Sequence, residues 1–323
     1  MRAVLRWTAI GAALLLVLTA GICLASYRRF SANITTDSAA EKVLAEFAAQ
    51  RPPSLVPRAR NILVLGAEGA SASPGSSAPG EEGDGGAGEG GAGEGGRGKG
   101  GAGEGGSEED GAGEDAAVLL HLSADRTRAA AVGVPRGLRL RVPGCRRPGG
   151  GSAPAAYEPF GAAFRDGGAA CSIRAFEQLS GVRIDHHLVV DVPRFHRIAD
   201  AVDDGTQAAG GDPRGDLLQA LAGAARGGRG SLAHPARLFG LLDTATSAIT
   251  ADPGLSSLPA LYGLAGTLRG LPAGGVTLVT LPMERSGGTA PGAARGGVLR
   301  RPAADRLFAA LRADRPLAPD GRP

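Results

Sequence analysis

The stretch AAVLLHLSADRTRAAAVGVP at 116–135 decides the fold of this chain. It holds two short apolar runs, 116–123 and 129–135, joined by the polar turn ADRTR, and this pattern predicts two buried strands. Short strands of such uniformly apolar character are typical of a central sheet that is covered on both faces.

Strand and helix patterns alternate on either side of this pair. NILVLG at 61–66, DHHLVVDV at 185–192 and VTLVTLP at 276–282 predict further strands. Apolar residues at Ile173, Phe176 and Leu179 predict a helix that ends at Gly181. Helical patterns also cover 193–202, 216–225, 234–250 (with Pro235 in its first turn), 258–270 and 304–312. Strands interleaved with helices of ten or more residues predict an α/β layered architecture.

An uncharged segment, TAIGAALLLVLTAGICLAS, occupies residues 8–26. At a helical rise of ~1.5 Å per residue it covers roughly 28 Å, close to the hydrocarbon thickness of a membrane. We therefore expect one transmembrane helix, with a cleaved signal peptide as the alternative. Because Arg2 and Arg6 precede the segment and Arg28 and Arg29 follow it, the flanking charges leave its orientation open.

A block rich in Gly and Glu occupies residues 67–114, where GAGEGG occurs three times. It has no apolar periodicity, so we expect a disordered insert without a core. Residues 81–115 hold eleven acidic residues against Arg97 and Lys99, although the whole chain has a formal net charge of +3. The rest of the chain is therefore basic, which indicates either anionic partners or a coding sequence that favours Arg over Lys. The insert itself could cover a basic pocket or be a tolerated repeat expansion.

The cysteines allow one disulfide outside the apolar helix. With Cys23 inside that helix, Cys145 and Cys171 are left as a possible pair, and an exported domain permits their oxidation. Metal ligation by two thiols without further partners is the less favoured alternative.

Other local patterns lack the context that their chemistry needs. GEGGRGKG at 93–100 approaches a phosphate-binding loop, but it has Gly in place of the Ser or Thr and no strand before it. His186 and His187 are neighbours on a predicted strand, so one is expected to face the core and the other solvent. The sequence shows neither a nucleophile elbow nor the spacing of zinc ligands.

Several blocks resemble, in order and spacing, the extracytoplasmic domain of the LytR-CpsA-Psr family. The likeness extends over most of the chain outside the insert and the tail, and includes the apolar helix in front. The blocks are VLGAE at 64–68, EDAAVLLHLSADR at 114–126, VGVPRGLRLRVPGC at 132–145, and the segments 161–202, 234–255 and 274–283.

This resemblance implies a three-layer α/β/α domain with a central mixed sheet. It implies a phosphotransferase that binds a polyprenyl-pyrophosphate-linked glycopolymer and, with Mg²⁺, moves the phosphoglycosyl group to a peptidoglycan hydroxyl. A pyrophosphate needs arginines and a divalent cation held by carboxylates, and the lipid needs an apolar groove. The implied partners are this lipid-linked glycopolymer, peptidoglycan and the membrane, and no nucleic acid is expected.

The implied organisation is that of a single-pass protein of the cell membrane with an extracytoplasmic domain. Its parts are a cytoplasmic N-terminus at 1–7, the transmembrane helix at 8–26, a linker or stalk at 27–60, the domain at 61–283 with its insert at 67–114, and a C-terminal helix with a loose tail at 284–323.

Four residues receive roles from this resemblance. Asp115 matches the Asp of the family's Ser-Asp-Thr segment and would act in catalysis and hold Mg²⁺. Arg136 matches the Arg of its Pro-Arg-Asp motif and would act in catalysis and bind the pyrophosphate. Glu68 stands where the family has the Asp of a Gly-x-Asp-x-Arg loop and would be a second metal ligand, and Arg214 remains as a second pyrophosphate ligand.

The chain also departs from the family pattern. Gly69 and Ala70 occupy the turn where the family has an Arg, and Gly137 replaces the Asp of Pro-Arg-Asp. The Ser and Thr that flank the metal Asp are absent, and the arginine-rich stretch is reduced to GDPRGDLLQALAGAA at 211–225. The pair Cys145 and Cys171 falls where some members carry two cysteines, which supports the disulfide.

Three functional interpretations follow from these matches and departures. The first is an active glycopolymer phosphotransferase, and the second is a degenerate relative that binds lipid-linked or wall intermediates without turnover. The third is a transcriptional regulator, a label that some family members have carried. That role needs a cytoplasmic basic domain with a groove-reading helix, and the sequence indicates neither.

Overall fold

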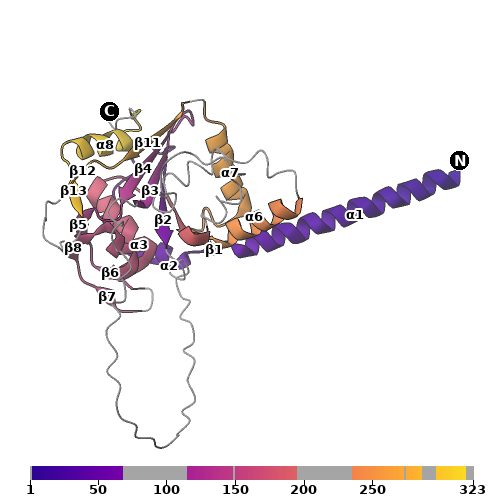
Figure 1. Cartoon of the computed structure of the whole chain (residues 1–323), viewed down its shortest axis with the longest axis horizontal. Coiled ribbons are helices and arrows are strands. Elements are labelled where there is room, and N and C mark those ends of the chain that lie inside the picture. The colour runs from indigo at the N-terminus through magenta and orange to yellow at the C-terminus, as the bar shows by residue number, and fades with distance from the viewer. Residues whose placement is uncertain are drawn as a thin grey trace, which may run out of the picture.

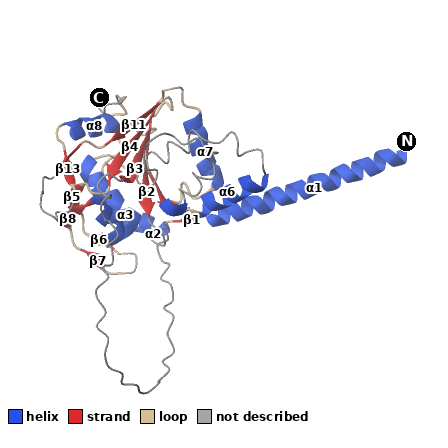
Figure 2. Cartoon of the chain, viewed as in Figure 1, coloured by secondary structure: helices blue, strands red, loops and turns tan. Residues whose placement is uncertain are grey.

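A computed structural model gives the fold of this chain, and the structure describes residues 2–67, 115–147, 150–194, 235–272, 274–285 and 296–317. A long helix extends from an α/β domain whose sheet lies between helices (Figures 1 and 2). The expected α/β class is confirmed.

Seven strands form one mixed sheet in the order β1-β10-β9-β2-β3-β4-β11. The central strand β2 pairs in parallel with β9 and antiparallel with β3, and β4 pairs antiparallel with β3 and in parallel with β11. The apolar runs predicted from the sequence provide five of these strands. The bounds are β1 Thr35–Thr36, β2 Arg60–Ala67, β3 Asp115–Leu122, β4 Ala129–Pro135, β9 His186–Asp191, β10 Ile249–Ala251 and β11 Val276–Thr280.

Each face of the sheet has its own hydrophobic core. Because successive residues of a strand point to opposite faces, Leu63 and Leu65 pack with α2 (Ser38–Glu46), α3 (Phe160–Ser180) and α8 (Ala303–Arg312). Ile62 and Val64 belong to the second core, against which α7 (Leu258–Arg269) packs. Figure 1 shows α3 and α7 on opposite sides of the sheet, so the layers are α/β/α.

Three short hairpin-like pairs and a 3-10 turn complete the domain. They are β5 Arg139–Val142 with β8 Ala156–Pro159, β6 Cys145–Arg146 with β7 Ser152–Ala153, β12 Met283–Arg285 with β13 Gly297–Leu299, and η1 Ala48–Gln50.

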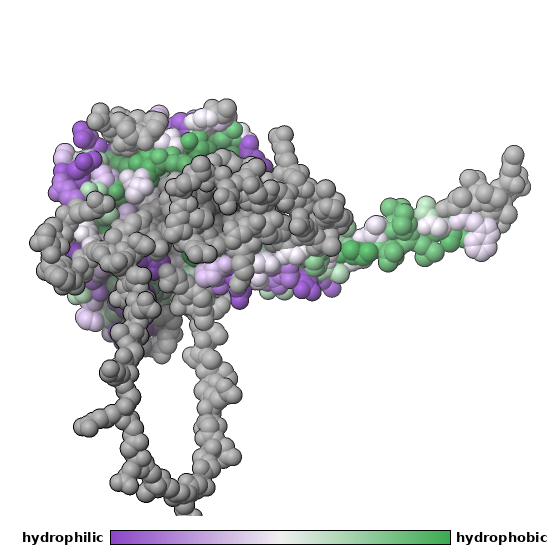
Figure 3. All heavy atoms as spheres, viewed as in Figure 1, coloured by the Kyte–Doolittle hydropathy of each residue, from purple (hydrophilic) through white to green (hydrophobic). Residues whose placement is uncertain are grey.

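The helix α1 (Arg2–Asn33) extends away from the domain and is hydrophobic over its middle (Figure 3). Its segment Ile10–Asn33 is long and apolar enough to cross a membrane once. The helix continues without a break beyond residue 26, where the sequence predicts the end of the transmembrane segment.

Both ends of the domain differ from the boundaries expected from the sequence. In the segment expected as a stalk at 27–60, β1 pairs with β10, and the buried Asp37 caps α2 by accepting a hydrogen bond from the backbone of Ala40. Residues 34–60 are therefore part of the folded domain. The expected C-terminal helix, α8, also packs into the main core through Leu307, Phe308 and Leu311, so the domain continues beyond residue 283.

One predicted helix is shorter than its pattern. The helix expected at 234–250 is α6 (Pro235–Ser247), and residues Ile249–Ala251 form β10, which pairs antiparallel with β9. β-branched residues such as Ile249 and Thr250 suit the edge of a sheet better than a helix. The helices predicted at 193–202 and 216–225 lie almost entirely outside the described residues.

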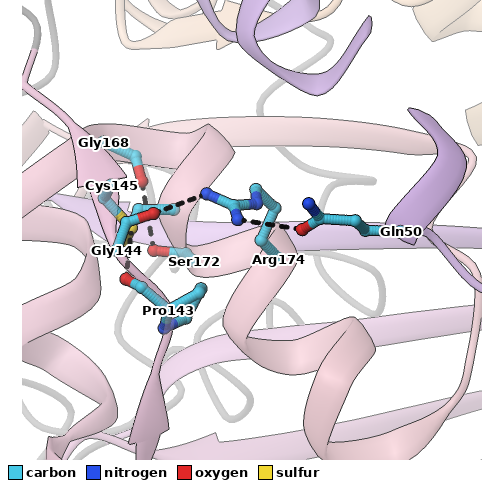
Figure 4. Close-up of a disulfide and its surroundings, with 8 residues drawn as sticks. Gln50, Pro143, Gly144, Cys145, Gly168, Ser172 and Arg174 are labelled. Carbon is cyan, nitrogen blue, oxygen red and sulfur yellow. Dashed lines mark hydrogen bonds between the residues drawn. A yellow bond between two sulfur atoms is a disulfide. The ribbon is translucent and has the colours of Figure 1, made fainter. Parts of the chain in front are cut away.

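The expected disulfide joins Cys145 of β6 to Cys171 of α3, with 5.6 Å between the Cα atoms (Figure 4). The backbone of α3 leaves the helical conformation at Gly167 and Gly168, just before Cys171. A Cβ atom on Gly167 would lie only 2.7 Å from the Cys171 Cβ and 2.8 Å from the Cys145 Cβ. The disulfide therefore depends on a residue without a side chain at position 167. Arg174 supports the same corner, because it donates a hydrogen bond of 2.7 Å to the Gly144 carbonyl.

Removing this disulfide is expected to lower the free energy of unfolding. With a sequence separation of 26 between the two cysteines, the chain-entropy model gives about 3.5 kcal/mol for Cys145→Ala combined with Cys171→Ala. Urea unfolding of the full chain in detergent measures this loss. Cys23→Ala is the matched control, since Cys23 is a free cysteine in α1, and an equal loss in this control would contradict the prediction.

Candidate functional site

The register of the sheet brings the ends of four strands together at one edge. Asp115, the first residue of β3, pairs with Pro135, the last of β4. Ala67, the last residue of β2, pairs with Asp191, the last of β9. Because β3 runs antiparallel to β2 and β4, its beginning lies beside their ends. We call this row of strand ends, from Asp191 to Pro135, the carboxyl edge.

Two of the four predicted site residues are described, and both belong to the carboxyl edge. Asp115 lies in the row itself, and Arg136 directly follows Pro135. Glu68 follows Ala67 in the chain but lies outside the described residues, as does Arg214.

Arg136 is half-buried, and its position depends on the first turn of α3. Its carbonyl oxygen accepts a hydrogen bond of 3.1 Å from the N–H of Gly161. A Cβ atom on Gly161 would lie 2.7 Å from the Arg136 Cγ. The Arg136 side chain thus lies directly against α3, in a space that only glycine leaves open.

A second arginine at the carboxyl edge was missed in the sequence. The buried Asp191 carboxylate accepts a hydrogen bond of 3.0 Å from the N–H of Arg194, and its other oxygen lies 3.3 Å from the Arg194 Nε. The Arg194 guanidinium also donates to the Ser247 carbonyl at 3.0 Å. The sequence does contain a pattern that indicates Arg194. The same tripeptide, Val-Pro-Arg, stands at the carboxyl end of the apolar run of β4 and of that of β9.

The donors at this edge suit a hard divalent cation in their chemistry. Asp115 and Glu68 carry carboxylates, whose oxygens Mg²⁺ prefers as ligands, and the backbone of Asp115 lies in this row of strand ends. Within the described part of the chain, no group of three or more His, Cys, Asp or Glu residues could hold a metal ion.

An apolar strip lies on the α7 side of the sheet. Val276 and Leu278 of β11 are 48% and 41% exposed, and they pair with Ala129 and Ala131 of β4. Those two alanines belong to the core under α7, so the exposed side chains share that face. Figure 3 shows a hydrophobic band over the region of β11.

A different polar cluster lies at the other ends of these strands, opposite the carboxyl edge. His186 pairs with Ile62 near the start of β2, and its Nδ1 lies 3.0 Å from an Asp252 carboxylate oxygen. The His187 Nε2 lies 3.3 Å from an Asp37 oxygen. The His187 side chain is 2% exposed and that of His186 28%, so the two rings face opposite sides as expected. His186 borders a polar cavity of about 160 Å³, remote from the carboxyl edge.

The pair of His186 and Asp252 is expected to make stability depend on pH. The hydrogen bond to Asp252 raises the pKa of His186 above its ordinary 6.5, although partial burial opposes this. Because the pKa of His186 is higher in the folded than in the unfolded chain, the protonated ring contributes its full stabilisation below about pH 6.5. This contribution disappears as the pH rises through the pKa of His186 in the folded chain.

The destabilisation caused by His186→Gln should therefore be larger in mildly acidic than in alkaline buffer. Urea unfolding of the full chain at several pH values measures it. Arg141→Gln is the control, because Arg141 is an exposed residue of β5. A difference that grows with pH would contradict the assignment.

Comparison with known proteins identifies the family of this chain. Residues 31–208, more than half of the chain, match the family model described as the LytR_cpsA_psr family. The chain belongs to the LytR-CpsA-Psr family. At the level of the family, membership assigns it to cell-wall glycopolymer transfer by enzymes that are generally dependent on a divalent metal. No curated protein matches the chain.

Several solved structures are similar to this LytR-CpsA-Psr protein. TagT of B. subtilis is 14% identical, with 80% of this chain and 91% of that chain covered and a TM-score of 0.42. TagU and TagV of B. subtilis are 10% and 12% identical, with 80% of this chain and 98% of each of those chains covered and TM-scores of 0.45 and 0.48. TagT has also been solved bound to LI-WTA. At these identities the likeness concerns the fold alone.

Proposed function

We propose that this LytR-CpsA-Psr protein is a membrane-anchored phosphotransferase. It moves a phosphoglycosyl group from a polyprenyl-pyrophosphate carrier to a hydroxyl of peptidoglycan. The observation that supports this most directly is the carboxyl edge, where the sheet register brings Asp115, Arg136 and Arg194 to one row of strand ends.

The charges at this edge match what the reaction requires. The acceptor hydroxyl oxygen forms a bond to the sugar-bearing phosphorus, the P–O bond of the pyrophosphate bridge breaks, and polyprenyl phosphate leaves. Negative charge grows on the leaving phosphate, and arginine donors stabilise such charge through paired hydrogen bonds. Arg136 is the proposed catalytic donor, with Arg214 as the second pyrophosphate ligand expected from the sequence. Arg194 is an additional donor at the same edge.

Magnesium is the proposed cofactor, with Asp115 and Glu68 as its ligands. When bound, a divalent cation neutralises part of the charge on the pyrophosphate oxygens. The carboxylate of Asp115 would also orient the acceptor hydroxyl and take up its proton. The exposed apolar strip of Val276 and Leu278 is the proposed contact for the first isoprene units of the carrier.

We also propose that α1 is a true membrane anchor, with the N-terminus in the cytoplasm and the domain outside. The disulfide of Cys145 and Cys171 supports this orientation, because such bonds persist in oxidising compartments.

Binding without turnover is the second candidate function. It is favoured by the loss of the acidic residue after Arg136, where Gly137 stands, and by the existing bonds of the Arg194 guanidinium to Asp191 and Ser247. Both candidates predict affinity for the lipid-linked pyrophosphate, and only the first predicts catalysis.

One experiment separates the two candidates. The full chain in vesicles receives a labelled polyprenyl-pyrophosphate sugar, an acceptor glycan strand and Mg²⁺, and the release of polyprenyl phosphate is followed. Catalysis that Asp115→Asn removes supports the phosphotransferase. Retention of the labelled lipid without release, for a range of sugars and divalent metals, supports the binding protein instead.

A further inference from the structure

The helix α1 does not end at the membrane boundary but docks along α6. The Arg29 guanidinium pairs with the Asp243 carboxylate through two bonds of 2.8 and 3.0 Å, and the Asn33 amide donates to the same carboxylate at 2.9 Å. The rings of Phe30 and Phe239 lie 4.9 Å apart. Figure 1 shows α6 lying beside the base of α1.

These contacts also set the direction and the level of α6. Phe239 meets Phe30, and Thr246, further along α6, lies 3.2 Å from the Asn33 amide. The two helices therefore run parallel. Both rise ~1.5 Å per residue, so counting back from Phe30 puts Pro235 at about the level of Ser26, and counting back from Asn33 puts it at about the level of Ile22. The first residue of α6 is thus level with the last residues of the apolar segment 8–26.

The membrane-proximal end of this helix pair exposes apolar and aromatic side chains. Phe239 is 39% exposed, Leu242 is 42% exposed and Tyr27 is 48% exposed. Tyr and Trp are enriched at the membrane interface, where the apolar body meets lipid and the polar group meets water, and Phe and Leu commonly form the apolar face of helices that lie in this layer. Basic groups favour the same layer, and the Arg29 side chain is 60% exposed beside these residues.

We propose that the first two turns of α6 lie in the headgroup layer of the membrane beside α1. Phe239 contacts the boundary of the hydrocarbon, and Leu242 lies nearer to the aqueous side. This inference rests on the membrane anchoring of the proposed function. The lipid surface is the partner because the exposed side chains continue the spanning helix at the depth where it leaves the bilayer.

The other end of α6 connects this contact to the carboxyl edge. The Ser247 carbonyl accepts the bond from Arg194, and the Ala248 carbonyl accepts a bond of 3.0 Å from the N–H of Asp191. Thr246 is level with Asn33, seven residues beyond Ser26, which is about 10 Å along α1. The headgroup layer is roughly 5–8 Å thick. The site is therefore held just above the headgroups, within reach of a lipid-linked pyrophosphate.

The sole tryptophan of the chain makes this depth measurable. In a Trp7→Phe background, single reporters Phe239→Trp, Leu242→Trp and Leu55→Trp are introduced into the full chain. Each is reconstituted into vesicles of phosphatidylcholine and phosphatidylglycerol brominated near the headgroup end of the acyl chains. All three positions have exposed side chains, so the substitutions should be tolerated. Leu55 is the matched control, since it precedes β2 and lies toward the opposite edge of the sheet.

The proposal predicts a graded loss of fluorescence. We expect about a twofold loss for Phe239→Trp, as for a side chain that reaches the boundary between headgroups and acyl chains, a smaller loss for Leu242→Trp and none for Leu55→Trp. Equal quenching of all three reporters, a reversed order of the first two, or no quenching of Phe239→Trp overturns the proposal. The native Trp7 tests the anchor separately. If Trp7 is quenched and Phe239→Trp is not, the anchor stands and only the α6 contact is wrong.

Discussion

Arg136→Ala is expected to lower the rate of phosphoglycosyl transfer by about 10²- to 10³-fold, the usual effect of removing one fixed donor that faces developing charge. The side chain starts from the turn between β4 and β5, directly after the buried strand β4, and the Arg136 carbonyl accepts a hydrogen bond from the N–H of Gly161 in α3. Such a fixed donor needs little rearrangement when charge develops on the leaving phosphate. Transfer measured in vesicles, at saturating labelled lipid, gives the effect on turnover.

Two further variants test separately whether the charge or the position of the Arg136 guanidinium matters for turnover. Arg136→Lys keeps the charge but loses the paired geometry of a guanidinium, so only part of the activity should remain. Gly161→Ala keeps Arg136 intact but puts a methyl group 2.7 Å from its Cγ, which must displace the side chain. A fall in turnover for Gly161→Ala with little change in stability would show that the location of the guanidinium matters.

A matched control keeps this prediction falsifiable. Arg141 is exposed on β5 and carries the same charge away from the carboxyl edge. Arg141→Ala should therefore leave turnover within about twofold of the unmodified chain, as for a distant surface charge. If Arg136→Ala behaves like Arg141→Ala, Arg136 is not part of the machinery.

Much of the sheet could be predicted because its strands are apolar on both faces. A strand buried on both sides appears in the sequence as a continuous apolar run. The structure has a strand at each such run, at 61–66, 116–123, 129–135, 185–192 and 276–282. Strands β1 and β10 could not be found in this way. They are two and three residues long. β10 forms because β9 offers it hydrogen bonds, and β1 forms because β10 does.

The candidate site was only partly predictable, for a related reason. Arg136 could be recognised because it follows a buried strand and a proline. That Asp191 and Arg194 join the same edge depends on β9 pairing in parallel with β2, and the pairing partner of a strand is a long-range property. The space for Arg136 depends likewise on Gly161, which approaches it only through the packing of α3.

The second large effect is expected on the free energy of unfolding, when the ion pair of Arg51 and Glu177 at the N-terminal boundary of the domain is broken. Arg51 lies in the segment that the sequence suggested as a stalk, yet its guanidinium meets the Glu177 carboxylate of α3 at 2.7 and 2.9 Å. The Glu177 side chain is 2% exposed and that of Arg51 11%. The same groups bond the backbone N–H and C=O of Ile184 at 2.9 and 2.7 Å. The pair therefore joins three segments of the chain in one buried network.

Glu177→Ala is expected to lower the free energy of unfolding by about 3–5 kcal/mol, because it leaves the buried Arg51 charge without its partner. Glu46→Ala is the matched control. Glu46 pairs with Arg146 at 2.9 Å, but these side chains are 48% and 63% exposed, so its loss should cost about 1 kcal/mol or less.

Replacing both members, Arg51→Met with Glu177→Leu, should recover much of the loss, since no charge is then left buried. Urea unfolding of the full chain measures all three. If Glu177→Ala costs no more than Glu46→Ala, the buried pair does not hold residues 34–60 to the domain, and the anchor helix would join a loosely attached segment instead of the sheet.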